Sequence, residues 1–232
     1  MANKNIIWQI AIDGPAGVGK STVAKKLAQI LNFKYIDTGA MYRAITYLVI
    51  NSKVDLADLD KIYDLTSKAN IEFKQVDNQE LVYINNIDVT QAIRQDSVNK
   101  LVSTISAQKL VRSVLVEKQK ILAGLHSTIM DGRDIGTVVM PNAQLKIYLE
   151  ASSLVRAQRR YLQLINQGYT ADIDKIQAMI ELRDKQDMER LASPLKPAID
   201  AMVVNTDNLN QDEVIDTIIK AFNKICSGVK LA

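Results

Sequence analysis

The segment at residues 14–22 constrains the fold of this chain more than any other. It reads Gly-Pro-Ala-Gly-Val-Gly-Lys-Ser-Thr and contains the pattern G-x-x-x-x-G-K-[ST]. An apolar run of strand length precedes it at 6–12, and an amphipathic stretch with helical spacing follows at 21–31. Glycines allow a tight loop whose backbone N–H groups converge on an anion, and the following helix directs its positive end to the same point. We therefore predict a strand, a phosphate-binding loop and a helix, in that order.

This loop predicts that the chain binds a nucleoside triphosphate. Lys20 would reach the outer phosphates, and the Ser21 hydroxyl would bind Mg²⁺. The residues expected to contact the triphosphate are Gly14, Pro15, Ala16, Gly17, Val18, Gly19, Lys20, Ser21 and Thr22.

The rest of the chain alternates short apolar segments with helical patterns, which is typical of an α/β fold with a parallel sheet covered by helices on both faces. Between about 71 and 90, three short strand-like segments joined by polar turns indicate an antiparallel insert. Further strands are expected at 33–36, 127–130, 145–149 and 201–204, and further helices at 40–50, 96–122, 153–166 (with Ser152 as N-cap), 172–190 and 211–226.

Composition excludes several classes of protein. The 232 residues are 47% hydrophobic and 24% charged, which predicts one packed domain, with or without an insert. A single cysteine and a single histidine argue against a protein-held zinc site and fit a reducing, cytoplasmic setting. No apolar run approaches the ~20 residues needed to cross a bilayer, so we expect no membrane association. The net charge of +3 is far smaller than a nucleic-acid binder that neutralises many phosphates would need, which argues against that class.

The arginines are placed selectively. Lysine outnumbers arginine by 20 to 9, and of the arginines only Arg94 lies apart from segments with the character of a binding site. A guanidinium is a planar, permanently charged fork that matches a phosphate edge, so this choice points to anion recognition. A solvated, basic helix surface remains the alternative for each arginine alone. The other eight are Arg43, Arg112, Arg133, Arg156, Arg159, Arg160, Arg183 and Arg190.

Two groups of charged residues predict a site beside the phosphate loop. Arg183, Asp187 and Arg190 have i, i+4, i+7 spacing and therefore share one helix face. Asp131 and Arg133 follow an apolar strand, and ligands of open parallel sheets collect at the carboxyl ends of strands. Asp131 is then placed to help hold Mg²⁺, directly or through water, and Arg133 to meet a transferring phosphoryl group.

The acceptor of the phosphoryl group is expected to be an anion. A phosphate acceptor already carries its nucleophilic oxygen and mainly needs its charge neutralised, so several arginines favour a nucleoside monophosphate. Three alternatives stay open. They are a small kinase for a hydroxylated metabolite of the shikimate or gluconate kind, a GTP-binding switch, although no N-K-x-D stretch is present, and a nucleic-acid-binding module.

Four segments, in this order over nearly the whole chain, resemble those of bacterial cytidylate kinases, which are P-loop nucleoside monophosphate kinases. The resemblance implies ATP- and Mg²⁺-dependent phosphorylation of CMP and dCMP to CDP and dCDP, by a protein that we expect to be a monomer. Thr38 stands where many of these kinases have serine. The segments are Ile12 to Thr22, Asp37 to Arg43, Asp131 to Val139, and Arg183 to Leu195.

The resemblance also implies a P-loop kinase fold with a division of labour within one domain over 1–232. The core would comprise about 1–60 and 96–232, the monophosphate-binding insert about 61–95, and a helical lid about 152–190.

The roles that the resemblance implies fall into three sets. Arg43, Arg133, Arg183 and Arg190 would surround the acceptor phosphate, with Asp187 and Arg183 holding the sugar and Thr38 lying near it. Ser103, Arg112 and Asp134 would read cytosine, and Arg156, Arg159 and Arg160 match the lid. The residues predicted to be catalytic are Lys20, Arg133, Arg156, Arg160, Arg183 and Arg190.

Overall fold

The computed structural model describes residues 6–77 and 79–228. The chain forms two compact units. Unit 1 comprises Met1–Tyr35 and Leu122–Ala232, and unit 2 comprises Ile36–Ile121.

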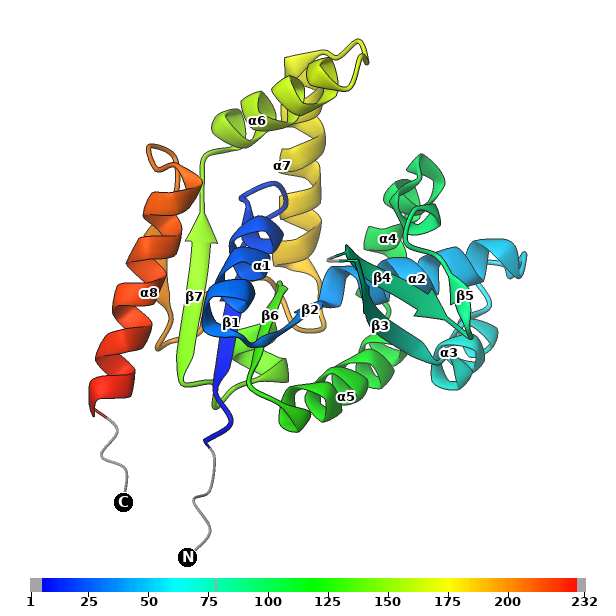
Figure 1. Ribbon diagram of the computed structural model, residues 1–232. Coiled ribbons are helices and arrows are strands. Elements are labelled where there is room, and N and C mark those ends of the chain that lie inside the picture. Colours follow the sequence, from blue (N-terminus) through cyan, green and yellow to red (C-terminus); the bar gives the residue numbers. More distant parts are fainter. Residues whose placement is uncertain (1–5, 78, 229–232) are drawn as a thin grey trace, which may run out of the picture. The chain divides into compact units, whose positions relative to one another are not determined.

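A five-stranded sheet in the order β2-β6-β1-β7-β8 forms the centre of unit 1 (Figure 1). β1 (Gln9–Asp13) pairs in parallel with β6 (Thr128–Gly132) and with β7 (Leu145–Glu150), and β7 pairs in parallel with β8 (Met202–Asn205). β2 (Lys34–Asp37) is the edge strand beside β6. The predicted α/β class with a central parallel sheet is thereby confirmed.

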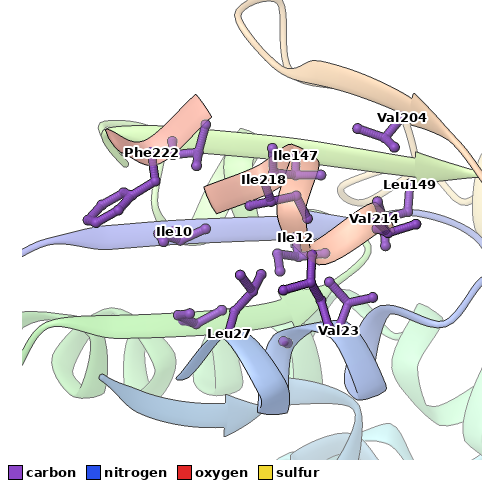
Figure 2. Packing of buried hydrophobic residues seen from close by; sticks show 14 of the residues in the cluster. Ile10, Ile12, Val23, Leu27, Ile147, Leu149, Val204, Val214, Ile218 and Phe222 are labelled. Atoms are coloured by element: carbon purple, nitrogen blue, oxygen red, sulfur yellow. The ribbon is translucent and has the colours of Figure 1, made fainter. Parts of the chain in front are cut away.

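The hydrophobic core of unit 1 lies between this sheet and two helices, α1 (Lys20–Leu31) and α8 (Gln211–Gly228). Figure 2 shows Ile10 and Ile12 of β1 beside Ile147 of β7, with Leu27 and Phe222 approaching from the two helices. Because side chains alternate along a strand, this packing directs every second residue of β1 and β7 to the opposite face of the sheet. Asp13 and Lys146 therefore lie on that opposite face.

The opposite face carries a short π-helix, η2 (Ile135–Val139), which begins next to Asp13. Two longer helices follow β7: α6 (Ser153–Asn166) and α7 (Ile173–Glu189). The Ser152 side chain accepts a hydrogen bond from the backbone N–H of Val155, so it is the N-cap that the sequence predicts. In Figure 1, α6 starts at the carboxyl end of β7 and α7 returns beside it.

Unit 2 contains an antiparallel sheet of three strands, as predicted: β3 (Ile71–Val76), β4 (Gln79–Ile84) and β5 (Ile87–Asp88). Its helices are α2 (Thr38–Asn51), α3 (Leu59–Lys68), α4 (Asp96–Ala107), the 3₁₀ turn η1 (Ala92–Arg94) and α5 (Lys109–Leu125). α2 packs against α3, α4 and β4.

Three expectations from the sequence are wrong in detail. The first strand begins at Gln9 rather than at residue 6, because its pairing with β6 starts there. The helix expected at 96–122 is two helices, separated by Gln108 in an extended conformation. Helix α3 was not expected at all. Of the helices within 6–77 and 79–228, none is both long enough and apolar enough to cross a membrane.

Candidate active site

The phosphate loop connects β1 to α1 with the backbone geometry that its glycines permit. Gly14, Gly17 and Gly19 have φ angles of 149°, 77° and 96°, which side chains other than hydrogen rarely tolerate. Gly14 is additionally needed for space, because a Cβ atom there would lie 2.1 Å from the carbonyl oxygen of Leu149. The loop therefore leaves the end of β1 in close contact with β7.

Lys20 is buried at the first turn of α1. Its Nζ donates to the carbonyl oxygen of Pro15 at 2.7 Å, within the loop itself. Burial and then the charge of Arg133 lower the pKa of Lys20 to about 7, against the opposing effect of Asp131. A second anion beside this ammonium would favour its protonated form.

Ser21 and Asp131 lie together at the carboxyl ends of the central strands. The Ser21 hydroxyl donates to Oδ2 of Asp131 at 2.8 Å, and the hydroxyl of Tyr35 donates to Oδ1 at 2.7 Å. Hard oxygen atoms of this kind are the ligands that Mg²⁺ prefers, with water and phosphate oxygens completing the shell. The residues present therefore fit a magnesium ion.

Arginine and aspartate side chains that follow β6 contact those at the end of α7. Nε of Arg133 donates to Oδ2 of Asp187 at 2.7 Å, and Nη2 of Arg190 lies 3.4 Å from Oδ1 of Asp134. Nη1 of Arg190 is 4.0 Å from Oδ1 of Asp187. Burial alone would raise the pKa of Asp187, but the charges of Arg133, Arg183 and Arg190 lower it. The carboxylate is thus ionised and holds the arginines in place.

Arg183 belongs to the same group of charges. It is half-buried, and its buried Nε has no hydrogen-bond partner among the described residues. Burial and the charge of Arg133 both lower the pKa of Arg183. A buried N–H group without an acceptor is costly, and an anionic ligand would remove that cost.

Arg156 joins α6 to the phosphate loop. It donates to the carbonyl oxygens of Ala16 and Ala151, both at 3.0 Å, and forms an ion pair with Asp184 at 2.7 Å. The other two arginines of α6 differ from it. Arg159 donates to the backbone oxygen and hydroxyl of Thr206, and Arg160 is exposed and donates to Gln163. Of these three, only Arg156 contacts the loop.

Unit 2 holds four of the predicted site residues. Thr38 is buried at the first position of α2, and Arg43, one turn later, donates to the side chain of Asn99 in α4. Asp37 is the N-cap of α2, since its Oδ1 accepts from the N–H of Ala40 at 2.9 Å. Arg94 lies 3.5 Å from the other oxygen of Asp37, so it belongs with this group rather than apart from it.

Ser103 and Arg112 lie on the successive helices α4 and α5, and Arg112 contacts the end of α4. Nη1 of Arg112 donates to the carbonyl oxygen of Ser106 at 3.1 Å. The Ser106 hydroxyl donates to the carbonyl oxygen of Ser103 at 3.2 Å. The Arg112 guanidinium also lies over the ring of Tyr42, 5.2 Å from its centre. Arg112 is only 3% exposed, so its orientation within unit 2 is set by packing.

The model of one protein family, described as cytidylate kinase, matches residues 10–224 of this chain. The chain belongs to the cytidylate kinase family. Two bacterial relatives of the same description are similar over almost their whole length. The cytidylate kinase of Lactobacillus gasseri is 49% identical over 220 residues, 95% of this chain and 96% of that protein. The one from Lactiplantibacillus plantarum is 47% identical, with 93% and 95% covered. Membership makes this chain a kinase.

A solved structure supports the fold of this family member independently. An uncharacterized protein from Eubacterium ventriosum superposes with a TM-score of 0.52 and covers 94% of this chain and 99% of its own. The two sequences are 14% identical, so the likeness concerns the fold alone.

Three residues that contact the candidate site were not predicted from the sequence. Tyr35 binds Asp131, Asp184 pairs with Arg156, and Asp13 accepts two backbone hydrogen bonds from η2. Asp184 is adjacent to Arg183 and Asp13 precedes the phosphate loop, so both stood next to predicted residues. No local sequence pattern predicts which residues they contact, because Asp184 is 28 positions from Arg156 and Asp13 is 122 positions from Ile135.

Proposed function

We propose that this chain transfers the terminal phosphoryl group of ATP to CMP and dCMP, giving ADP with CDP or dCDP, and that it requires Mg²⁺. The proposal rests on membership of the cytidylate kinase family and on the donor and acceptor chemistry of unit 1.

One observation carries the proposal. The buried Nε of Arg183 donates no hydrogen bond to any described residue, and the charge of Arg133 acts on this guanidinium, in the unit that also contains the phosphate loop. The charge of Asp187 offsets part of the repulsion between these two guanidinium groups, and a further anion would offset more of it. A doubly charged acceptor phosphate satisfies both, and two parallel N–H groups of arginine match its oxygen atoms.

The reaction then needs positioning and charge neutralisation more than it needs a base. An oxygen of the acceptor phosphate attacks the terminal phosphorus of ATP, a new P–O bond forms, and the bond to the bridging oxygen breaks to release ADP. Lys20 and Arg133 would neutralise the charge on the transferred group, and Arg156, next to the loop, would assist on the donor side. Ser21 and Asp131 would hold Mg²⁺, which supplies further charge neutralisation on the phosphates when it is bound.

The family resemblance also suggests residues for base and sugar recognition. Arg112 would donate to the O2 and N3 acceptors of cytosine, and Asp134 would accept from its exocyclic amine. Uracil has a donor at N3 and an acceptor at C4, so these two side chains would disfavour it. Ser103 would assist, and Asp187 with Arg183 would hold the sugar.

We also propose the division of labour within the chain. α6 and α7, within 152–190, would act as the lid, with Arg156, Arg159 and Arg160 on its first helix. The antiparallel strands, within 61–95, would extend the monophosphate-binding region. We propose that the protein works as a cytoplasmic monomer on free nucleotides, without nucleic acid or membrane, consistent with one cysteine and a net charge of +3.

An acceptor panel tests the function. The purified protein is incubated with ATP and Mg²⁺ and, separately, with CMP, dCMP, UMP, AMP and a set of hydroxylated metabolites. We expect ADP to form together with CDP or dCDP, which chromatography separates, and we expect much less turnover with UMP. Addition of EDTA should stop the reaction, and restoring Mg²⁺ should recover it.

The Lys20→Met variant, purified in the same way, controls for contaminating kinases and should be inactive. Turnover with hydroxylated metabolites alone would contradict the proposed acceptor. Tight binding of GTP with slow hydrolysis and no transfer to CMP would indicate a switch instead.

A further inference from the structure

Asp13 is a buried carboxylate that the proposed reaction does not use. It is the last residue of β1, directly before the phosphate loop, and is 3% exposed. Its two oxygens accept backbone hydrogen bonds from Ile135 at 2.8 Å and from Gly136 at 2.7 Å. These are the first two residues of the π-helix η2, so the carboxylate caps that helix across 122 positions of sequence.

The capped segment is also held from its other side. A Cβ atom on Gly136 would lie 3.2 Å from Cδ of Lys146 and 3.4 Å from Oδ2 of Asp13, so the backbone passes closely between the two side chains. Lys146 is fixed in turn, because its Nζ donates to the carbonyl oxygen of Pro141 and to the carboxylate of Asp200. The start of η2 therefore has little freedom to move.

Arg133 and Asp134 directly precede this point, and they face α7. Arg133 contacts Asp187, and Asp134 contacts Arg190. A shift of the backbone at Ile135 would displace both side chains from these partners. A misplacement of about 1 Å at a reacting centre lowers the rate by ~100-fold.

We propose that Asp13 is a positioning residue for Arg133. By binding the N–H groups of Ile135 and Gly136 it holds the Arg133 guanidinium at the place where the transferred phosphoryl group is neutralised. The inference rests on the proposed function. Burial makes the ionised form of Asp13 unfavourable in the folded chain and raises its pKa to about 6. A buried charge that costs stability is expected where it serves a site.

A different route from Asp13 to the reaction must be distinguished. The negative charge of Asp13 also favours the protonated form of Lys20. If Asp13 acted through Lys20, its effect would be independent of Arg133, whereas positioning requires Arg133 to be present.

A double-mutant cycle on kcat separates the two routes. Asp13→Asn keeps the size of the side chain but supplies one acceptor oxygen in place of two. We expect Asp13→Asn to lower kcat by ~10- to 100-fold and Arg133→Ala to lower it by ~100- to 1,000-fold. The double variant should be no more than about 3-fold slower than Arg133→Ala, because residues that act as a unit are not additive. KM for ATP should change less than kcat.

Folding and the assay are controlled in the same experiment. Asp216→Asn removes an exposed carboxylate from α8 in the same unit and should keep wild-type kcat. Urea unfolding of each variant gives the folded fraction at the assay temperature, so that kcat is expressed per folded molecule.

The outcomes separate this inference from the proposed function. If the wild-type protein does not phosphorylate CMP or dCMP, the proposed function fails. If it does, and the factors for Asp13→Asn and Arg133→Ala multiply in the double variant, the positioning role is overturned while the function stands. Unchanged turnover in Arg133→Ala overturns the positioning role as well.

Gly136→Ala provides the same cycle if Asp13→Asn does not fold. Its added methyl group pushes the start of η2 away from Lys146 and Asp13 while the Asp13 carboxylate is retained. We expect a kcat below that of the wild type, and no further loss of comparable size on the Arg133→Ala background. Independent factors in this cycle also overturn the inference.

Discussion

Arg156 of α6 and Asp184 of α7 form an ion pair of 2.7 Å in which the two side chains are 5% and 12% exposed. The same guanidinium donates to the carbonyl oxygen of Ala16 in the phosphate loop. One arginine therefore holds two helices and the loop together, and its orientation depends on Asp184. Because both side chains are buried, removing either charge would leave the other one buried without a counter-ion.

Asp184→Asn should be strongly destabilising. The amide retains the size of the carboxylate but leaves the buried charge of Arg156 uncompensated, which costs about 3 kcal/mol of unfolding free energy. Urea denaturation monitored by circular dichroism measures this difference. Glu189→Gln, an exposed change on the same helix, is the matched control and should stay within about 0.5 kcal/mol of the wild type. Equal effects of the two substitutions would contradict a structural role for the pair.

Gly14→Ala should damage the phosphate loop. The new Cβ would lie 2.1 Å from a backbone oxygen of β7, and the φ of 149° is strained for alanine. Overpacking and strain together should cost about 3 kcal/mol or more of unfolding free energy. Affinity for ATP, measured by calorimetry, should fall as well because the loop must move.

The control for this substitution is Gly124→Ala. Gly124 lies in α5, and a Cβ there has no neighbour within 4 Å. Alanine loses less backbone entropy than glycine in a helix, so this change should stabilise the protein by up to about 1 kcal/mol. If Gly14→Ala lowered neither the stability nor the ATP affinity, the close approach of the loop to β7 would be refuted.

Much of the fold was predictable because local chemistry and burial agree in most segments. β1 and β7 are apolar runs between polar turns, and the glycines of the phosphate loop mark the change from strand to helix. Helix α3 was missed because only two of its ten residues, Ile62 and Thr66, are buried, so its apolar periodicity is weak. Its N-cap, Asp58, accepts a hydrogen bond from the N–H of Lys61 and was the available signal. The break at Gln108 has no glycine or proline to announce it.

The candidate site was predictable in its cations but not in their partners. Sequence spacing places Arg183, Asp187 and Arg190 on one face of a helix, because that relation is local. The pairing of Arg156 with Asp184, and of Tyr35 with Asp131, depends on how separate elements pack, and no spacing encodes it. Arg94 was set aside for the same reason, since its contact with Asp37 joins residues 57 positions apart.

Arg183→Met should weaken binding of the acceptor far more than binding of ATP. Loss of a charged hydrogen bond to the acceptor phosphate costs about 1.5 to 3 kcal/mol, so KM for CMP should rise ~10- to 100-fold. KM for ATP should change by less than about 3-fold if the arginine serves only the acceptor. Steady-state kinetics with each substrate varied in turn give both values.

The same variant should not be less stable than the wild type. Burial lowers the pKa of Arg183, so its charged form carries a cost in the folded chain that methionine does not. Lys185→Met, exposed on the same helix, is the matched control for losing a cation. An equal rise of KM for CMP in both variants would remove Arg183 from the acceptor site.

Asp13 should make stability depend on pH in mildly acidic solution. Burial raises the pKa of this carboxyl from 3.8 to about 6 in the folded chain. Between these two values the folded chain retains a proton that the unfolded chain has lost, so the unfolding free energy falls as pH rises and levels off above about 6. Over this range the unfolding free energy falls by about 3 kcal/mol in total.

Asp13→Asn abolishes this pH dependence, so the variant should gain stability relative to the wild type as pH increases from about 4 to above 6. Urea unfolding of both proteins at several pH values, with Asp216→Asn as the control, measures the change. A difference between Asp13→Asn and wild type that stays constant over this range would show that the carboxyl of Asp13 titrates in the folded chain as it does in the unfolded one.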